Sequence, residues 1–287
     1  MKCQHCRKKA IIKSPRLCED HFPEYFERKI GKFLDKFKIK NKKILVSISG
    51  GKDSVVVSYV LSKLKEKYNL QIEYFFIDLG IPIFSEKSKE ISLEVTKKLN
   101  NELIIYNLEK EDGFTIMDIK YKPCSYCGMI RRYILNKYAY ENNFDYVVLG
   151  HNLDDEVFFL FNNMFNKNIS QLQRTGPLTL TIKEKKLIGR IKPLYFLTEE
   201  EILLYAKLNS LPYIGCACPN SLKSTQRKFK TNIEFSRDQK LNIVYTILEV
   251  KKYLPEEKVE LKFCQNCGYP TTSDTCKFCK TKERLRR

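Results

Sequence analysis

A short apolar run followed at once by a glycine-rich loop constrains this chain most. Residues 43–48 read KILVSI, residues 49–54 read SGGKDS, and an apolar helical stretch follows at residues 55–67. A strand, a glycine turn and a helix in this order form an anion cradle, because backbone N–H groups and the helix N-terminus point at the same place. The stretch therefore predicts a phosphate-binding loop at the end of a buried strand.

The loop is not a Walker A motif, which needs a longer spacer between its first glycine and the Gly-Lys pair. SGGKDS at a strand end instead resembles the PP-loop of ATP pyrophosphatases, which cleave ATP between the α and β phosphates and transfer AMP. An ordinary strand–helix turn with a capping serine is the alternative, and six specified residues in the right context speak against it. The loop residues expected to bind ATP are Ser49, Gly50, Gly51, Lys52, Asp53 and Ser54.

The composition narrows the class of protein and its partners. With 287 residues and 43% hydrophobic content, the chain suits one sizeable core plus appendages. A formal net charge of +18 points to a polyanionic partner, either nucleic acid or an anionic membrane. No run approaches the ~18 apolar residues of a membrane span, and the opening MKCQHC lacks the apolar core of a signal peptide. We expect a cytoplasmic protein, in which cysteines serve metal or redox chemistry rather than disulfides.

Both ends of the chain carry paired knuckles of metal-ligand residues. A Cys-x-x-Cys pair and a Cys-x-x-His pair lie near the N-terminus, and two Cys-x-x-Cys pairs lie near the C-terminus. Such pairs, separated by a short loop, are typical of tetrahedral zinc sites, although scattered reduced thiols are the alternative. The predicted ligands are Cys3, Cys6, Cys18 and His21 for the first zinc, and Cys264, Cys267, Cys276 and Cys279 for the second.

Between these ends, apolar β-rich runs alternate with helical stretches, which predicts an open, doubly wound parallel α/β sheet. The strand candidates are residues 44–49, 72–78, 103–107 and 146–150, and the helix candidates are residues 55–67, 85–100, 129–142 and 154–166. Residues 23–40 have the spacing of an amphipathic helix that docks the first zinc module. Residues 178–191 suggest a hairpin, and Thr198 with Glu201 has the pattern of a capping box that starts a helix.

Polar residues follow the ends of the predicted strands. SGGKDS follows the first, Asp78 the second, and GHNLDDE begins at Gly150 after the fourth. Ligands bind beyond the carboxyl ends of such strands, so we expect Asp78 and Gly150 near ATP. A turn role for Asp78 and a structural role for His151 are the alternatives. One of Asp154 and Asp155 can cap the next helix while the other serves as a Mg²⁺ ligand or general acid/base.

Of the eleven cysteines, seven belong to the terminal sites, which leaves Cys124, Cys127, Cys216 and Cys218. The first two open a predicted helix, where thiol pKa values are lowered, and this suits redox chemistry or metal ligation. Thiolates select zinc or an iron–sulfur cluster. A third zinc and a catalytic disulfide or persulfide carrier stay open as alternatives. We prefer a cluster that is held by three cysteines and has one open iron, chiefly because of the family resemblance described next.

The whole chain resembles the TtcA/TtuA family of tRNA 2-thiolation enzymes, which includes the wobble-uridine thiolases. The resemblance rests on SGGKDS, on PCSYCG at residues 123–128, on GHNLDDE at residues 150–156 and on a late cysteine before proline. It implies that ATP adenylates a uridine C2 oxygen and that sulfur then displaces AMP. It also implies a 4Fe–4S cluster held by Cys124, Cys127 and Cys218, because the family cysteine precedes proline as Cys218 does. The free iron would hold the transferred sulfur.

The resemblance also assigns catalytic roles. Asp155 matches the family's catalytic aspartate, and Lys52 supplies a point charge in the ATP loop. The family's catalytic lysine, four residues after the second cluster cysteine, falls on Arg131 here. Arginine stays protonated and cannot act as a base. We therefore keep Arg131 as a residue that holds a phosphate or stabilises charge.

Within the family, the terminal zinc modules look more like TtuA, which acts on uridine 54, than like the wobble enzymes, which act on uridine 34. The resemblance implies tRNA as a partner, a homodimer, and a sulfur donor that is free sulfide or a thiocarboxylated ubiquitin-like protein. Two other readings stay open. One keeps the ATP domain but makes the reaction an amidation or lysidine-type ligation, and the other is a non-catalytic, zinc-dependent RNA-binding protein.

The last third of the chain is rich in basic residues. Lys223, Arg227, Lys228 and Lys230 lie close together, a helical pattern runs on from Asn232, and the tail from Lys280 is dense in base. These residues can neutralise tRNA phosphates, although a solvated helix face explains each one equally well. The predicted divisions are a zinc finger (1–24), a linker helix (25–40), a PP-loop domain with the iron–sulfur site (41–220), a basic helical segment (221–258) and a zinc ribbon (259–287).

Overall fold

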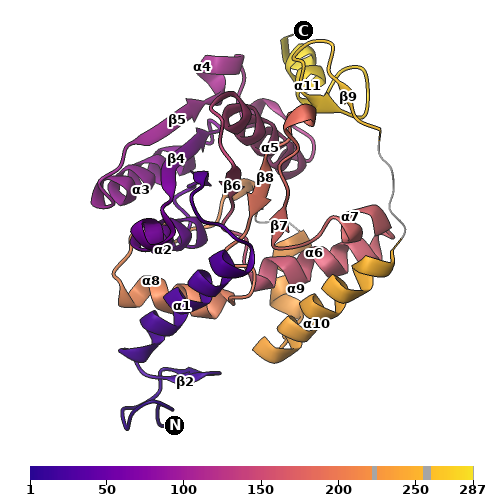
Figure 1. Ribbon diagram of the computed structural model, residues 1–287. Coiled ribbons are helices and arrows are strands. Elements are labelled where there is room, and N and C mark those ends of the chain that lie inside the picture. Colours follow the sequence, from indigo (N-terminus) through magenta and orange to yellow (C-terminus); the bar gives the residue numbers. More distant parts are fainter. Residues whose placement is uncertain (222–224, 255–259, 287) are drawn as a thin grey trace.

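The computed structural model describes residues 1–221, 225–254 and 260–286. In this part of the chain the core is a six-stranded sheet in the order β5-β4-β3-β6-β8-β7, in which only β7 pairs antiparallel (Figure 1). The strands are β3 (Lys43–Ser47), β4 (Gln71–Asp78), β5 (Leu103–Asn107), β6 (Tyr146–Val148), β7 (Leu178–Thr179) and β8 (Gly189–Ile191). The predicted doubly wound α/β fold is confirmed, with one antiparallel edge strand.

Helices cover both faces of this sheet. They are α1 (His21–Lys36), α2 (Lys52–Tyr68), α3 (Phe84–Lys98), α4 (Leu108–Asp112), α5 (Pro123–Glu141), α6 (Leu153–Phe165), α7 (Ile169–Gln173), α8 (Glu199–Leu208), α9 (Thr225–Asn232), α10 (Arg237–Val250) and α11 (Lys277–Arg286). No helix among the described residues has the length and apolar character needed to cross a bilayer.

Alternate residues of the central strands face opposite layers. On β3, Ile44 and Val46 belong to the apolar core beneath α1, α2 and α8, whereas Leu45 belongs to the core beneath α5 and α11. Residues of β4 alternate between the same two cores. A strand has a side-chain period of two, so a strand buried on both faces reads as a continuous apolar run. This is why KILVSI carries no charge after Lys43.

Helix α2 begins earlier than its apolar pattern predicts. The structure places its first residue at Lys52 rather than at Val55. Lys52, Asp53 and Ser54 therefore form the first helical turn, where backbone N–H groups lack an intrahelical acceptor. The polar half of the SGGKDS loop is thus part of the helix N-terminus, and this strengthens the predicted anion cradle.

The hairpin predicted at residues 178–191 extends the main sheet. Its second strand, β8, pairs parallel with β6, which gives the sheet a fifth parallel strand that the sequence analysis did not predict. The Thr181 hydroxyl donates to the Asp145 carbonyl at 2.6 Å and accepts from the Gly189 N–H at 2.7 Å. The hairpin is therefore tied to the start of β6, and β8 ends near the same edge as the ATP loop.

The basic segment is broken into two helices. The helical pattern from Asn232 predicted one continuous helix, but α10 starts only at Arg237, because Ser236 and Gln239 form a capping box. Phe235, just before the cap, stacks on Phe161 of α6 at 5.6 Å between ring centroids. Lys223 and the side chains of Arg227 and Lys228 lie outside the described residues.

The terminal modules lie at opposite ends of the molecule in Figure 1. The N-terminal one contains the short strands β1 (Ile12–Lys13) and β2 (Arg16–Leu17), and the C-terminal one contains β9 (Lys262–Phe263) and β10 (Pro270–Thr271). Helix α11 of the C-terminal module packs on α5, where Phe278 stacks on Tyr133 at 4.0 Å between ring centroids. The C-terminal module thus lies over the helix that starts with Cys124 and Cys127.

We predict that Gly50→Ala destabilises the protein far more than Gly51→Ala does. Gly50 has φ +71°, and a Cβ atom there would lie 2.8 Å from the Ser88 carbonyl oxygen. Left-handed backbone and this clash should together lower the free energy of unfolding by about 1–3 kcal/mol. Gly51 has φ −74°, and its Cβ would meet only the Ser49 hydroxyl at 3.6 Å.

Urea unfolding of both variants without nucleotide measures the difference. For the Gly51→Ala control we expect a loss below about 1 kcal/mol, the scale of a weaker N-cap. Equal losses for the two variants would contradict the geometry assigned to the loop.

Candidate active site and metal centres

The SGGKDS loop is closed by its own serines. The Ser54 hydroxyl donates to the Gly51 carbonyl at 2.9 Å and accepts from the Ser49 N–H at 3.0 Å. The Ser49 and Ser54 hydroxyl oxygens lie 3.1 Å apart. These bonds hold the loop so that the first-turn amides of α2 point outward, which is the arrangement that binds a phosphate.

Gly150 packs directly on this loop from the end of β6. A Cβ atom at Gly150 would lie 3.0 Å from the Ser54 backbone nitrogen and 3.1 Å from the Asp53 carbonyl carbon. A side chain there would push the first turn of α2 away from β6. Gly150 therefore lets two strand ends meet, in addition to its predicted place near ATP.

A cavity of about 440 Å³ opens beside the loop. It is lined by loop residues, by strand-end residues and by residues that follow the Cys-x-x-Cys pair, among them Ser49, Gly51, Asp53, Ser54, Gly150, Asp155, Gly128 and Arg131. Lys52 and Asp78 are not among the described residues that line it. The cavity brings the predicted ATP loop, Asp155 and Arg131 together.

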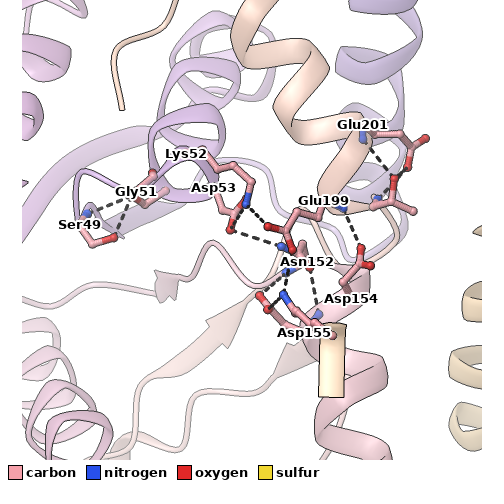
Figure 2. Close-up of polar contacts among 12 residues, drawn as sticks. Ser49, Gly51, Lys52, Asp53, Asn152, Asp154, Asp155, Glu199 and Glu201 are labelled. Atoms are coloured by element: carbon pink, nitrogen blue, oxygen red, sulfur yellow. Dashed lines mark hydrogen bonds and ion pairs between the residues drawn. The ribbon is translucent and has the colours of Figure 1, made fainter. Parts of the chain in front are cut away.

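Lys52 points instead into a chain of alternating charges, which Figure 2 shows in part. Its Nζ lies 2.8 Å from Glu199 Oε1 and 3.1 Å from Asp53 Oδ1. Glu199 Oε2 pairs with Lys230 Nζ at 3.0 Å, and Lys230 Nζ pairs with Asp155 Oδ1 at 2.7 Å. The chain links the N-termini of α2, α6 and α8 with α9.

These pairs shift the pKa values of their members. Burial alone would raise the pKa of Glu199, but Lys52 and Lys230 lower it to about 2. Burial alone would lower the pKa of Lys230, but Asp155 and Glu199 raise it above its ordinary value. Lys230 therefore stays protonated and holds Asp155 by charge rather than accepting a proton from it.

Burial disfavours the ionised form of Asp53, a carboxylate in this chain of charges. Burial raises its pKa to about 6, and the Asp155 charge adds to this, although Lys52 opposes it. Its Oδ1 atom is buried and, apart from the ion pair with Lys52 Nζ at 3.1 Å, has no hydrogen-bond partner among the described residues. A buried carboxylate that lines a cavity fits a cation or a polarised ligand.

The two aspartates of GHNLDDE have separate roles. Asp155 closes a capping box with Asn152 and also lines the cavity, and its Oδ1 accepts from Gln226 at 2.8 Å. Asp154 accepts from the Glu199 N–H at 2.8 Å and pairs with Lys240 at 2.6 Å. Asp154 thus joins α6 to α8 and α10, whereas Asp155 both caps its helix and faces the site.

The other two strand-end residues differ in position. Asp78 Oδ1 accepts from the Gly80 N–H at 3.0 Å, and Oδ2 accepts from the Asn107 side chain at 3.3 Å. That is the geometry of a turn residue, so its contact with ATP stays a prediction. His151 lines the cavity, and burial together with Lys192 lowers its pKa to about 4. His151 is therefore neutral at pH 7.

The structure brings Cys218 toward the helix that Cys124 and Cys127 start. The Cys124 thiol donates to the Asn220 carbonyl at 3.1 Å, and Cys127 and Cys218 both pack against the core beneath α5, whereas Cys124 and Cys216 are exposed. Contrary to the prediction from a helix N-terminus, the pKa of the Cys124 thiol is raised. Burial causes this, and the nearby Cys127 and Cys218 thiols add to it.

The terminal residues form two compact ligand sets. In each predicted quartet the four ligand atoms lie within 4.8 Å of one another. The Cys6 and Cys18 sulfurs are 3.6 Å apart, and the Cys267 and Cys276 sulfurs are 3.8 Å apart. Tetrahedral Zn–S bonds of ≈ 2.3 Å place sulfurs about 3.8 Å apart. Both quartets therefore fit a single metal ion.

Sequence reasoning missed Glu199. It lies beside Thr198, and the run Thr198–Glu201 was interpreted only as a capping box, which the structure confirms. Its partners Lys52 and Lys230 lie 147 and 31 residues away along the chain. Three consecutive glutamates at a helix start are a weak signal, because acidic residues are common there for the helix dipole alone.

Comparisons with known proteins agree with this site. The model of the PP-loop domain family matches residues 23–229. A protein of Pyrococcus horikoshii named tRNA-5-methyluridine(54) 2-sulfurtransferase is 42% identical over 98% of this chain and 93% of its own length. The protein of the same name in Thermotoga maritima is 38% identical over 99% of this chain and 97% of its own length.

A solved structure is similar over the same extent. It is the U34-tRNA thiolase NcsA from Methanococcus maripaludis, with its 4Fe–4S cluster, at a TM-score of 0.84 and 27% sequence identity. The match covers 99% of this chain and 96% of that one. The fold and the loop define a PP-loop protein. The chain belongs to the family of PP-loop tRNA thiolation enzymes that its motifs resemble.

We predict that Asp53→Asn stabilises the protein at neutral pH. A carboxyl whose pKa is raised on folding costs stability as the pH rises from its unfolded value, 3.8, toward about 6. Relative to wild type, the variant should therefore gain stability across that window and reach a plateau of up to about 3 kcal/mol above it.

Unfolding free energies from pH 4 to pH 8 test this. Asp238→Asn is the control, because Asp238 is 74% exposed, and its difference from wild type should stay flat. A flat difference for Asp53→Asn as well would show that Asp53 carries no burial penalty.

Proposed function

We propose that this protein is an ATP-dependent tRNA 2-thiouridine synthetase that acts at uridine 54. It adenylates the C2 oxygen of the uridine and then replaces that oxygen with sulfur. The observation that carries the proposal is that one cavity of about 440 Å³ is lined jointly by the PP-loop, by Asp155 and by residues close to Cys127. Activation by ATP and delivery of sulfur can therefore meet at one nucleotide.

The PP-loop residues bind and orient ATP in this proposal. The amides at the start of α2 and the Ser49 hydroxyl would face the phosphates, and the Ser54 hydroxyl would hold the loop in shape through its bonds to Gly51 and Ser49. Mg²⁺ would be held by the two carboxylates that line the cavity, Asp53 and Asp155, and would then share them with Lys52 and Lys230. Mg²⁺ prefers such oxygen ligands. Lys52 contributes its charge through Asp53 and Glu199.

Two bonds form and two break in the reaction. The uridine C2 oxygen attacks the α-phosphorus of ATP, and pyrophosphate leaves. Sulfur at the oxidation level of sulfide then attacks C2, and AMP leaves with the oxygen. Asp155, which pairs with Lys230 at 2.7 Å, is placed to orient the nucleotide or take a proton in these steps. Arg131 lines the cavity and can stabilise negative charge on phosphate, but it cannot act as a base.

Cys124, Cys127 and Cys218 would hold a 4Fe–4S cluster. The donor set fits, because thiolates are the ligands of such clusters and the Cys218 segment is hydrogen-bonded to Cys124. A cluster with three protein ligands leaves one iron open, and that iron would supply a place for the sulfur before transfer. Two zinc ions in the terminal quartets would give those small modules the stability that their few apolar residues lack.

The names of the relatives support uridine 54. The two relatives reported above act, by name, on 5-methyluridine 54, and they are 42% and 38% identical to this chain. The wobble-uridine thiolase is 27% identical. Action at uridine 34 is therefore the second candidate.

Several parts of the proposal concern partners and setting. The net charge of +18 suits tRNA, and the sulfur donor is free sulfide or a thiocarboxylated ubiquitin-like protein. A cytoplasmic setting agrees with eleven free cysteines. The homodimer and the five-part division of the chain stay predictions. An amidation or lysidine-type ligation would give Cys124, Cys127 and Cys218 no role. A non-catalytic RNA-binding function would give the intact SGGKDS loop no role.

We predict that Cys124→Ala abolishes thiolation, whereas Cys216→Ala retains most of it. Cys124 lies beside Cys127 and Cys218, and Cys216 is exposed outside their apolar surroundings. Thiolated nucleoside is measured after incubation of each anaerobically purified variant with tRNA transcript, ATP, Mg²⁺ and sulfide.

Zinc content serves as the control, since both variants should keep both zinc ions. Full activity of Cys124→Ala would remove the cluster from the mechanism. Tight tRNA binding by the wild-type protein without any AMP formation would favour the non-catalytic reading.

A further inference from the structure

Four arginines line the cavity and have no carboxylate partner among the described residues. Within the described part of the chain, Arg131, Arg132, Arg174 and Arg190 make no side-chain ion pair or hydrogen bond, although all four line the cavity. The fifth cation, Lys192, is different, because it pairs with the buried Glu156 at 2.7 Å. Unpaired positive charge in a concave site indicates an anionic ligand.

The carboxylates of the cavity do not balance these arginines. Asp53 lies 3.1 Å from Lys52, and Asp155 lies 2.7 Å from Lys230, so each already has its own lysine. The amides of α2 add further positive potential on the loop side. ATP carried with Mg²⁺ neutralises only part of this charge, so a second anion is needed.

Arg132, on α5, and Arg190, on β8, line this cavity together, and both also line a second cavity of about 420 Å³ next to the C-terminal module. Burial, together with the charge of Arg132, lowers the pKa of Arg190. Arg132 folds back over Gly128, where a Cβ atom would lie 3.2 Å from its Nη1. The Arg132 guanidinium therefore adjoins the segment that follows Cys127.

We propose that Arg132 and Arg190 bind a phosphodiester of the substrate RNA next to the nucleotide that is modified. This inference rests on the proposed function, because it takes the RNA to enter on the side of the cysteines. The nucleotide must present C2 between the α-phosphate of ATP and the sulfur, and its own backbone phosphate then lies beside the base. Two arginines suit a phosphate because each offers a fork of N–H donors to its oxygens.

The test compares RNA binding and ATP binding in Arg132→Gln, Arg190→Gln and the double variant. The dissociation constant of a tRNA transcript is measured by fluorescence anisotropy from 50 to 300 mM salt, at values chosen for roughly even spacing on a logarithmic scale. Binding of ATP without RNA is measured by calorimetry. Loss of one phosphate contact should reduce the slope of log affinity against log salt by about 1 in the double variant.

The expected result has three parts. The slope of log RNA affinity against log salt falls in the double variant. A single Arg190→Lys variant, which keeps the positive charge, retains most of the wild-type slope. The ATP dissociation constant of every variant stays within about twofold of wild type, which also shows that the variants are folded. The charge control is Arg28→Gln, which removes an exposed arginine of α1 that does not line the cavity. Its slope should match that of wild type.

Two results would overturn the inference. Weaker ATP binding with an unchanged RNA slope would assign the arginines to the nucleotide phosphates, and unchanged binding of both ligands would show that they hold neither. A wild-type protein that binds no tRNA transcript would contradict the proposed function itself, and that measurement comes before any variant is compared.

Discussion

The contact between Gly150 and the first turn of α2 is the constraint on which the site depends. A Cβ atom there would meet the backbone of Asp53 and Ser54 at 3.1 and 3.0 Å, so the ends of β3 and β6 meet only because this residue has no side chain. The contact places the SGGKDS amides and the start of α6 on one cavity. Because ligands of open parallel sheets bind beyond the strand ends, the rest of the chemistry is arranged around this junction.

Charge organises the site on a larger scale. A chain of alternating positive and negative side chains connects helix ends that lie far apart in the sequence. It runs through Lys52, Glu199, Lys230 and Asp155. Lys52 and Lys230 each pair with two carboxylates, and neither lysine lines the cavity. The negative charges of Asp53 and Asp155 are therefore neutralised by lysines that lie outside the cavity lining. The four arginines that line the cavity have no ion-pair partner in the part of the chain that the structure describes, and the cavity as a whole attracts anions. This division separates the groups that hold the site together from those that meet ligands.

The fold and the two terminal clusters of potential metal ligands could be predicted from the sequence because their signals are local. The KILVSI run, the SGGKDS loop and the paired knuckles each lie within a few residues, and their spacing carries the physical reason. The positions of Glu199 and of the Arg132–Arg190 pair in the site could not be predicted in this way. Their neighbours in the site come from other elements of the fold, far away along the chain. The pKa of Cys124 was predicted in the wrong direction, because burial and neighbouring thiols outweigh the helix N-terminus.

Metal and sulfide analysis of anaerobically purified protein, with its absorption spectrum, tests the central claim most directly. The claim is that Cys124, Cys127 and Cys218 hold a cluster beside the ATP cavity. It predicts about four iron and four sulfide with about two zinc per chain, and broad absorption in the visible range. About three zinc and no iron would contradict it, because the four central cysteines would then form a third structural zinc site.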